Sequence, residues 1–232
     1  MNHPTSIQAK AAIFGFWSAI LAAVFAVAFA ILAIAFPATE WNGIGAYARS
    51  FQSTQMASFI PAILLALAVV VLMVSLHFHA AEDQRIFTLL ALAFAVMYAT
   101  IVGVNYYLQL FVVRLNLLAG QLEDLALFAM PNFHSAFFAL EAIGYSFSSL
   151  ATLIVVPVFS GGRLAGWIRR LFVLNGAIGI LGAIAAPFDQ PLLILASLGF
   201  WSLNYPLSML LVGVYFKRAK VGTAGTIAAL AG

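Results

Sequence analysis

Glu141 is the residue with the clearest potential for chemistry, because it is a carboxyl inside a long apolar run. The run extends from Phe133 to Val158 and contains no Lys or Arg. An ionisable side chain in a membrane segment is costly and commonly marks a functional site. A protonated carboxyl there could donate a hydrogen bond to a ligand, and we therefore expect Glu141 to bind a ligand or to take part in proton coupling.

Further polar side chains recur at helical spacing around Glu141. His134 precedes it by seven residues, and Tyr145, Ser148 and Thr152 follow at intervals of four, three and four. Side chains at these intervals share one face of a helix. The pattern predicts a polar stripe along this segment.

A second polar stripe lies on an earlier apolar segment, where Tyr98, Asn105 and Gln109 also share a face. With a rise of about 1.5 Å per residue, Asn105 and Glu141 each lie roughly 12 Å from the outer ends of their segments. Polar faces at matching depth avoid lipid by facing each other or a common cavity. We expect a chamber that opens toward the outer side and is lined by Glu141, Tyr145, Asn105, Gln109, Asn204, Trp201, Tyr106 and His134. The alternative is that these groups bond to each other and only set the helix register.

Other kinds of site find little support in the sequence. The chain has no cysteine, which excludes disulfides and thiol chemistry. No phosphate-binding glycine loop occurs, and no apolar segment carries a lysine that could bind a chromophore. His77 and His79 point about 200° apart on a regular helix, so we expect interfacial positions for them and not a metal or haem site. We predict no metal, no cofactor and no catalytic residue.

The composition places these residues in a membrane protein. Of 232 residues, 65% are hydrophobic and 7% are charged, whereas an average soluble domain has about 25% charged residues. Spans of roughly 20 residues fill most of such a chain. We expect an all-α, polytopic membrane protein with one domain over residues 1–232 and six transmembrane helices, at about 13–36, 55–78, 86–113, 133–158, 167–186 and 192–216.

The connections carry fewer signals. Trp41, Ile44, Tyr47 and Phe51 recur every three or four residues, which predicts a short helix lying at the membrane interface. Residues 114–132 are expected to form a loop that packs back onto the bundle. Small residues on the first and fifth spans predict close helix packing.

Basic residues distinguish the two sides of the membrane. Six spans put both chain ends on the same side, and eight basic residues fall on that side against two on the other. Cytoplasmic connections carry the excess of Lys and Arg, so we predict cytoplasmic termini. The pattern resembles that of small prokaryotic six-span proteins, which predicts the inner (plasma) membrane and implies no activity. The eight residues are Lys10, Arg85, Arg163, Arg169, Arg170, Lys217, Arg218 and Lys220; the two are Arg49 and Arg114.

Three functions are compatible with these features. We favour a chamber that binds or transports a small amphiphile, a lipid or a proton-linked solute. The second is an accessory or scaffolding subunit, in a homo-oligomer or a larger membrane complex, because such a subunit needs only packing surfaces. The third is an intramembrane enzyme with Glu141 as acid or base; we disfavour it because His134 lies about 10 Å away along the helix. Membrane lipid is an expected partner, and nucleic acid is not.

Overall fold

The fold is helical throughout the part of the chain that the structure describes. A computed structural model describes residues 6–188 and 190–230, without the side chains of Pro191 and of residues 220–230. Asp189, which falls in the turn before the sixth predicted span, and the side chain of Lys220 therefore lie outside the description. Within the described ranges no strand is present.

Among the described residues, six helical stretches are long and apolar enough to cross a membrane, which confirms the predicted all-α fold and the prediction of six segments of spanning length. The connections are short turns, except for residues 36–58 and 120–135. The α-helices are α1 (Ser6–Ala35), α2 (Ile44–Ser50), α3 (Phe59–His79), α4 (Arg85–Leu108), α5 (Arg114–Ala119), α6 (Ala136–Ile154), α7 (Gly162–Ala185) and α8 (Pro191–Leu230).

The third span is longer than we predicted. We placed its end at Val113 and a loop from Arg114, but α4 continues through a π-helical turn (Gln109–Val113) into α5 and stops at Ala119. Nothing in the sequence of α5 breaks a helix. Gly120 ends it in the left-handed conformation (φ 69°), and Gln121 N donates to Asn116 O in the bond pattern typical of a glycine-terminated helix. The loop is therefore confined to residues 120–135.

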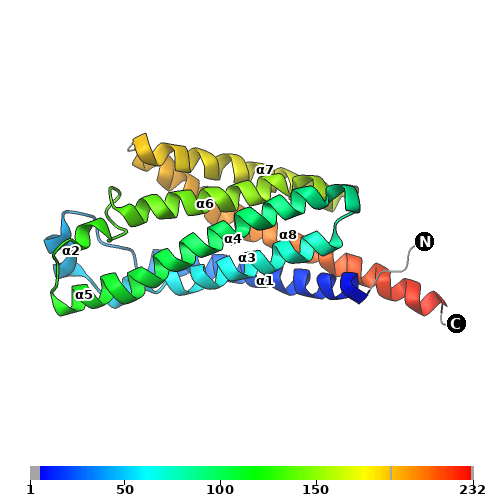
Figure 1. The fold of residues 1–232 in the computed structure, drawn as a ribbon, viewed down its shortest axis with the longest axis horizontal. Helices are drawn as coiled ribbons and strands as arrows, with labels where there is room; N and C mark the ends of the chain where they lie inside the picture. Colours follow the sequence, from blue (N-terminus) through cyan, green and yellow to red (C-terminus); the bar gives the residue numbers. More distant parts are fainter. Residues whose placement is uncertain (1–5, 189, 231–232) are drawn as a thin grey trace.

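The six spans form a closed ring in chain order. Each of α1, α3, α4, α6 and α7 packs on the next spanning helix, and α8 packs back on α1. Figure 1 shows that α1 begins and α8 ends at one end of the bundle, while α2 and α5 lie at the other. We call the latter the loop end. Short connections between neighbours favour this antiparallel arrangement.

Small residues allow the ring to close. Ala19, Ala22 and Ala26 of α1 are fully buried, and a Cβ on Gly213 of α8 would lie 2.9 Å from Ile20. The small-residue face predicted on the first span is thus used for packing inside the chain.

A smaller apolar cluster covers the loop end. Tyr47 of the predicted interfacial helix packs with Met56, Val113, Leu117 and Leu125. Burial raises the pKa of Tyr47 to about 12, so the phenol is neutral at physiological pH. This cluster fixes α2 and residues 120–135 over the ends of the spans.

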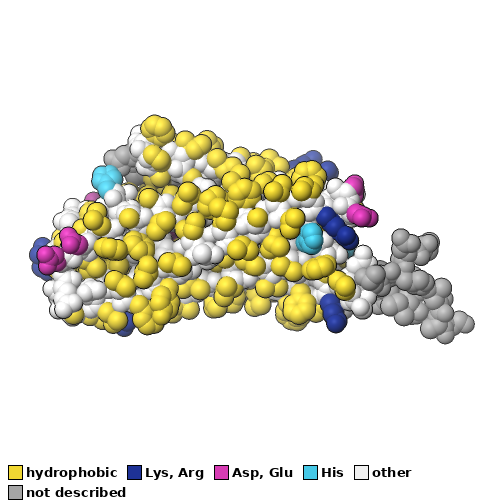
Figure 2. Space-filling model, viewed as in Figure 1, with side chains coloured by type: hydrophobic (Ala, Val, Ile, Leu, Met, Phe, Trp, Pro, Cys, Tyr) yellow, Lys and Arg dark blue, Asp and Glu magenta, His cyan; other side chains and the backbone are white. Residues whose placement is uncertain are grey.

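The outer surface matches a bilayer environment. Ile34 and Leu192 are 81% exposed, an arrangement suited to lipid and not to water. Figure 2 shows hydrophobic side chains across the middle of the molecule and charged side chains at its two ends. The chain is therefore an integral, multi-pass membrane protein.

Candidate functional site

Glu141 lies in the second turn of α6, near the loop end. The helix begins at Ala136, where the Ser135 hydroxyl accepts a hydrogen bond of 3.0 Å from Phe138 N. Such a side-chain cap satisfies one of the free N–H groups of the first turn. The cap sets the start of α6, and with it the height of Glu141 in the bundle.

Tyr106 of α4 is the direct partner of Glu141. Its hydroxyl donates a hydrogen bond of 2.7 Å to Glu141 Oε1 and lies 3.1 Å from the Tyr145 hydroxyl. Because Tyr106 has one proton and gives it to Glu141, Tyr145 donates the second bond. Phe59 of α3 stacks on the Tyr106 ring at 4.7 Å and 6°. Tyr106 is fully buried, so three helices hold its hydroxyl at Glu141.

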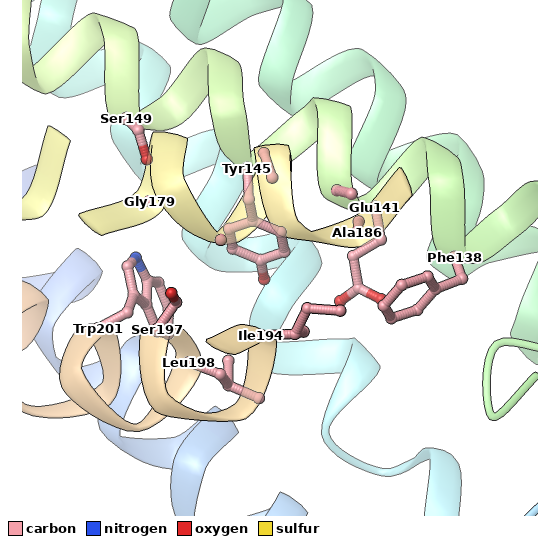
Figure 3. A pocket seen from close by; sticks show the side chains of 13 residues that line it. Phe138, Glu141, Tyr145, Ser149, Gly179, Ala186, Ile194, Ser197, Leu198 and Trp201 are labelled. Carbon is pink, nitrogen blue, oxygen red and sulfur yellow. The ribbon is translucent and has the colours of Figure 1, made fainter. Parts of the chain in front are cut away.

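A cavity of about 150 Å³ adjoins the carboxyl of Glu141, between α6, α7 and α8. Each helix contributes side chains at intervals of three and four residues, which is one helix face. Figure 3 shows the Glu141 carboxyl beside Phe138 and Ile194, and the Tyr145 ring directed toward α8. The lining residues are Phe138, Glu141, Ala142, Tyr145 and Ser149 of α6; Gly179, Gly182, Ala183 and Ala186 of α7 and the turn after it; and Ile194, Ser197, Leu198 and Trp201 of α8.

Two glycines bring α7 close to both neighbours beside this cavity. A Cβ on Gly179 would overlap the Ser149 hydroxyl of α6, and one on Gly182 would lie 2.8 Å from Ser197 Cβ of α8. Any larger residue at either position must displace a neighbour. Because α7 has no side chain at Gly179 and Gly182, the hydroxyls of Ser149 and Ser197 can lie at the cavity wall.

Aromatic rings form one side of the cavity. Tyr145 and Trp201 meet edge to face, with centroids 5.6 Å apart and an interplanar angle of 82°. Behind them, Tyr98 packs on Tyr145 at 5.6 Å, and Tyr205 stacks on Trp201 at 5.1 Å. Such ring contacts add to the stability that apolar burial provides. The rings that face the cavity are thus held by a second layer of rings.

Among the described residues, no cationic side chain lines the cavity beside Glu141. None of the cavity-lining residues is Lys, Arg or His, and its hydrogen bond from Tyr106 involves only Oε1. Among the described residues, no side chain is shown donating to Oε2. The second carboxylate oxygen is therefore available to a molecule in the cavity.

The structure brings four of the eight predicted chamber residues together. Glu141, Tyr145 and Trp201 line the cavity, and Tyr106 supports Glu141 from behind. His134 does not line this cavity; it lies at a neighbouring groove between α6 and α7.

The other three predicted residues bind backbone groups elsewhere. Asn105 Nδ2 donates to Phe137 O at 3.0 Å, and Asn204 Nδ2 donates to Leu171 O at 3.1 Å. Gln109 donates to Phe128 O at 2.6 Å and accepts from Met130 N at 3.3 Å. These three amides join helices to each other and to the loop. They therefore have the alternative role that we considered, which is to fix the packing of the helices and not to line a chamber.

Our sequence reasoning did not select Ser149, Ser197, Gly179 or Gly182 as site residues. The spacing held a usable signal, because Ser149 lies eight residues after Glu141 and shares its face with Tyr145. Thr152, which we placed on that face, instead accepts a hydrogen bond of 3.1 Å from Asn175 of α7. The glycines of α7 were interpreted as packing residues, and they also shape the cavity.

The histidines at the opposite end of the bundle have partners of other kinds. His77 Nδ1 lies 2.8 Å from the Thr88 hydroxyl, and the His79 ring packs against Tyr215 and Phe216. Among the described residues, no group of three His, Asp or Glu side chains could hold a metal ion.

The groove between α6 and α7 is larger than the cavity, at about 820 Å³. Its walls include Ile143 and Ile184, which are 47% and 54% exposed on the apolar surface. Phe138, Ala142, Ala183 and Ala186 line both spaces. The groove and the cavity are therefore neighbours that share a wall.

Comparison with known proteins does not extend these observations, since the chain matches no family model, no curated protein and no solved structure.

Proposed function

We propose that this membrane protein binds or transports a small amphiphile, whose polar head enters the cavity at Glu141. The supporting observation is the carboxyl itself: Tyr106 holds one oxygen, and the other adjoins an apolar cavity. Ligand sites are typically apolar hollows with a few polar groups that set orientation. Glu141, Tyr145, Ser149 and Ser197 are such groups here.

We propose further that the termini are cytoplasmic and that the membrane is a prokaryotic plasma membrane. The excess of basic residues at the end where α1 begins supports this orientation. It places the cavity in the outer half of the bilayer. An amphiphile in the outer leaflet then lies at the level of Glu141.

The alternative functions have less support. The small residues that suggested a scaffolding subunit pack within the chain, at α1 against its neighbours and at α7 against Ser149 and Ser197. The enzyme that we considered would pair His134 with Glu141, and His134 is not on the cavity wall.

Ligand binding can be measured through Trp201, which lines the cavity. A variant that keeps only this tryptophan (Trp17, Trp41 and Trp167 changed to Phe) would be placed in lipid nanodiscs and titrated with alkyl amphiphiles that differ in head group. We expect saturable quenching of its fluorescence by at least one head group.

Two neighbouring residues of α8 give a matched control for this experiment. Ile194→Phe adds volume inside the cavity and should weaken binding, because Ile194 lines it. Leu195→Phe makes the same addition on the lipid-facing side, where Leu195 is 54% exposed, and should leave binding unchanged. Equal effects of both substitutions, or no saturable signal with any head group, would count against a binding site at Glu141.

A further inference from the structure

The cavity and the groove differ in size in a way that fits the two parts of an amphiphile. An apolar cavity of about 150 Å³ is the size that admits benzene, so the cavity at Glu141 holds a head group but not a long chain. The adjoining groove has about 820 Å³. The two spaces share four lining residues, so a tail that passed between these residues would lie in the groove.

The charge of the site selects the head group. A carboxylate in an apolar cavity without a cationic neighbour is costly unless it is neutralised or paired. Apart from Trp201, the polar lining side chains are those of Glu141, Tyr145, Ser149 and Ser197, and none of them is positively charged. The repulsion between an anionic head group and the Glu141 carboxylate would therefore not be offset by a cation. A cationic head supplies the missing partner.

The aromatic side of the cavity also favours a cation. A cation near the face of a Trp or Tyr ring is attracted by the ring's quadrupole, and more strongly where water is excluded. Tyr145 and Trp201 line the cavity together with Glu141 and meet edge to face.

The groove fits a hydrocarbon tail that lies along α6 and α7, because most of its lining residues are apolar; His134, Ser135 and Ser146 are its polar lining residues. It runs between α6 and α7 on the lipid-facing surface, and Phe138 lies on the wall between groove and cavity. Figure 3 shows the Phe138 ring next to the Glu141 carboxyl. A molecule that moved from the groove into the cavity would pass this ring.

We infer that the site takes a single-chain alkylamine, with its ammonium group at Glu141 Oε2 and its tail in the groove between α6 and α7. This inference rests on the proposed function and adds the ligand class and the route of entry to it. The amine donates to Oε2, while Tyr106 keeps its hydrogen bond to Oε1.

The test compares three probes of equal chain length: dodecylamine, dodecanol and dodecanoate. Binding is measured at a pH at which the amine is charged, by quenching in the Trp201-only variant in nanodiscs. We expect dodecylamine to bind more tightly than dodecanol by about ten-fold or more, and dodecanoate to bind least. Glu141→Gln, which keeps the side-chain shape, should remove this preference without abolishing dodecanol binding. Glu123→Gln, on an exposed residue of the loop, is the control.

A second variant series tests the position of the tail. Ala139→Trp narrows the groove but not the cavity, since Ala139 lines only the former. It should weaken dodecylamine more than butylamine, whose short chain needs little of the groove. If Glu141→Gln proves unstable, this series still tests the assignment.

The outcomes separate the inference from the proposed function. Similar binding of all three probes, still sensitive to Ile194→Phe, would overturn the amine assignment and leave a binding site at Glu141. Equal loss of both amines in Ala139→Trp would mean that the substitution acts through the head site, and would overturn the placement of the tail in the groove. No binding of any probe would remove both proposals.

Discussion

The hydroxyl of Tyr106 donates a hydrogen bond of 2.7 Å to Oε1 of Glu141, and the Tyr145 hydroxyl lies 3.1 Å from the same phenol oxygen. One phenol on α4 therefore joins two side chains of α6 that stand one turn apart. This contact links the two helices at the level of the cavity and leaves one carboxylate oxygen free to act.

Replacing Tyr106 by Phe should destabilise the protein. The substitution keeps the ring that stacks on Phe59 but removes the hydrogen bond that the Tyr106 hydroxyl donates to Glu141. Leaving a buried polar group without its partner costs about 1–3 kcal/mol. Tyr107→Phe is the control, because Tyr107 is 54% exposed and stacks on Phe111. Unfolding in mild detergent measures both, and equal stabilities would contradict the role assigned to Tyr106.

Gly179→Ala should disturb the contact between α6 and α7. Its Cβ would overlap the Ser149 hydroxyl, and overpacking of this kind costs about 1–3 kcal/mol. Adding Ser149→Ala should restore part of the stability, since it removes the overlapping oxygen. Gly166→Ala tests the same change on the same helix where a Cβ meets nothing within 4 Å. Thermal unfolding temperatures of the wild type, Gly179→Ala, Gly179→Ala with Ser149→Ala, and Gly166→Ala test this prediction. An unchanged unfolding temperature of Gly179→Ala would contradict the close approach of α7 to α6.

Gln109→Leu should loosen the loop at the loop end of the bundle. Gln109 is fully buried, donates to Phe128 O and accepts from Met130 N. Without these bonds two loop backbone groups lose their partners, at about 1–3 kcal/mol. Hydrogen–deuterium exchange should rise in residues 120–135 and stay unchanged in α3. Gln121→Leu is the control, because Gln121 is exposed. Unchanged exchange in Gln109→Leu would mean that the hydrogen bonds of Gln109 do not hold the loop in place.

The orientation in the membrane can be tested with single cysteines, because the chain contains none. We expect Glu123→Cys, in the loop between α5 and α6, to react with a membrane-impermeant thiol reagent added to intact cells. Asp83→Cys, in the turn between α3 and α4, should react only after the membrane is opened. The physical basis is the excess of basic residues at the end that contains Asp83. The reverse labelling pattern would place the termini outside.

The register of α6 shows how far spacing alone can go. Ser148 and Ser149 are adjacent, and helical spacing from Glu141 allows either to share its face. The structure places Ser149 on the cavity wall and turns Thr152 toward Asn175. Which serine lines the cavity depends on where α7 approaches α6. That approach depends on the glycines of α7, which cannot be inferred from the spacing of residues on α6.

The path of α4 shows the same limit. Asn105 and Gln109 share a face by spacing, yet one bonds to α6 and the other to the loop. The π-helical turn that begins at Gln109 changes the rotation of the helix there. Spacing of residues on one segment cannot specify which neighbour each side chain meets.

The sequence by itself determined that the chain has six apolar segments long enough to cross a membrane and that Glu141 is an isolated carboxyl in the fourth of them, because the length of an apolar run and its interruption by a charge are local properties. Only the tertiary structure decided that Tyr106 is the partner of Glu141 and that Gly179, Gly182 and Ser197 shape a cavity beside it. Those relationships come from helices far apart in the chain, whose rotation and separation are set by packing against one another.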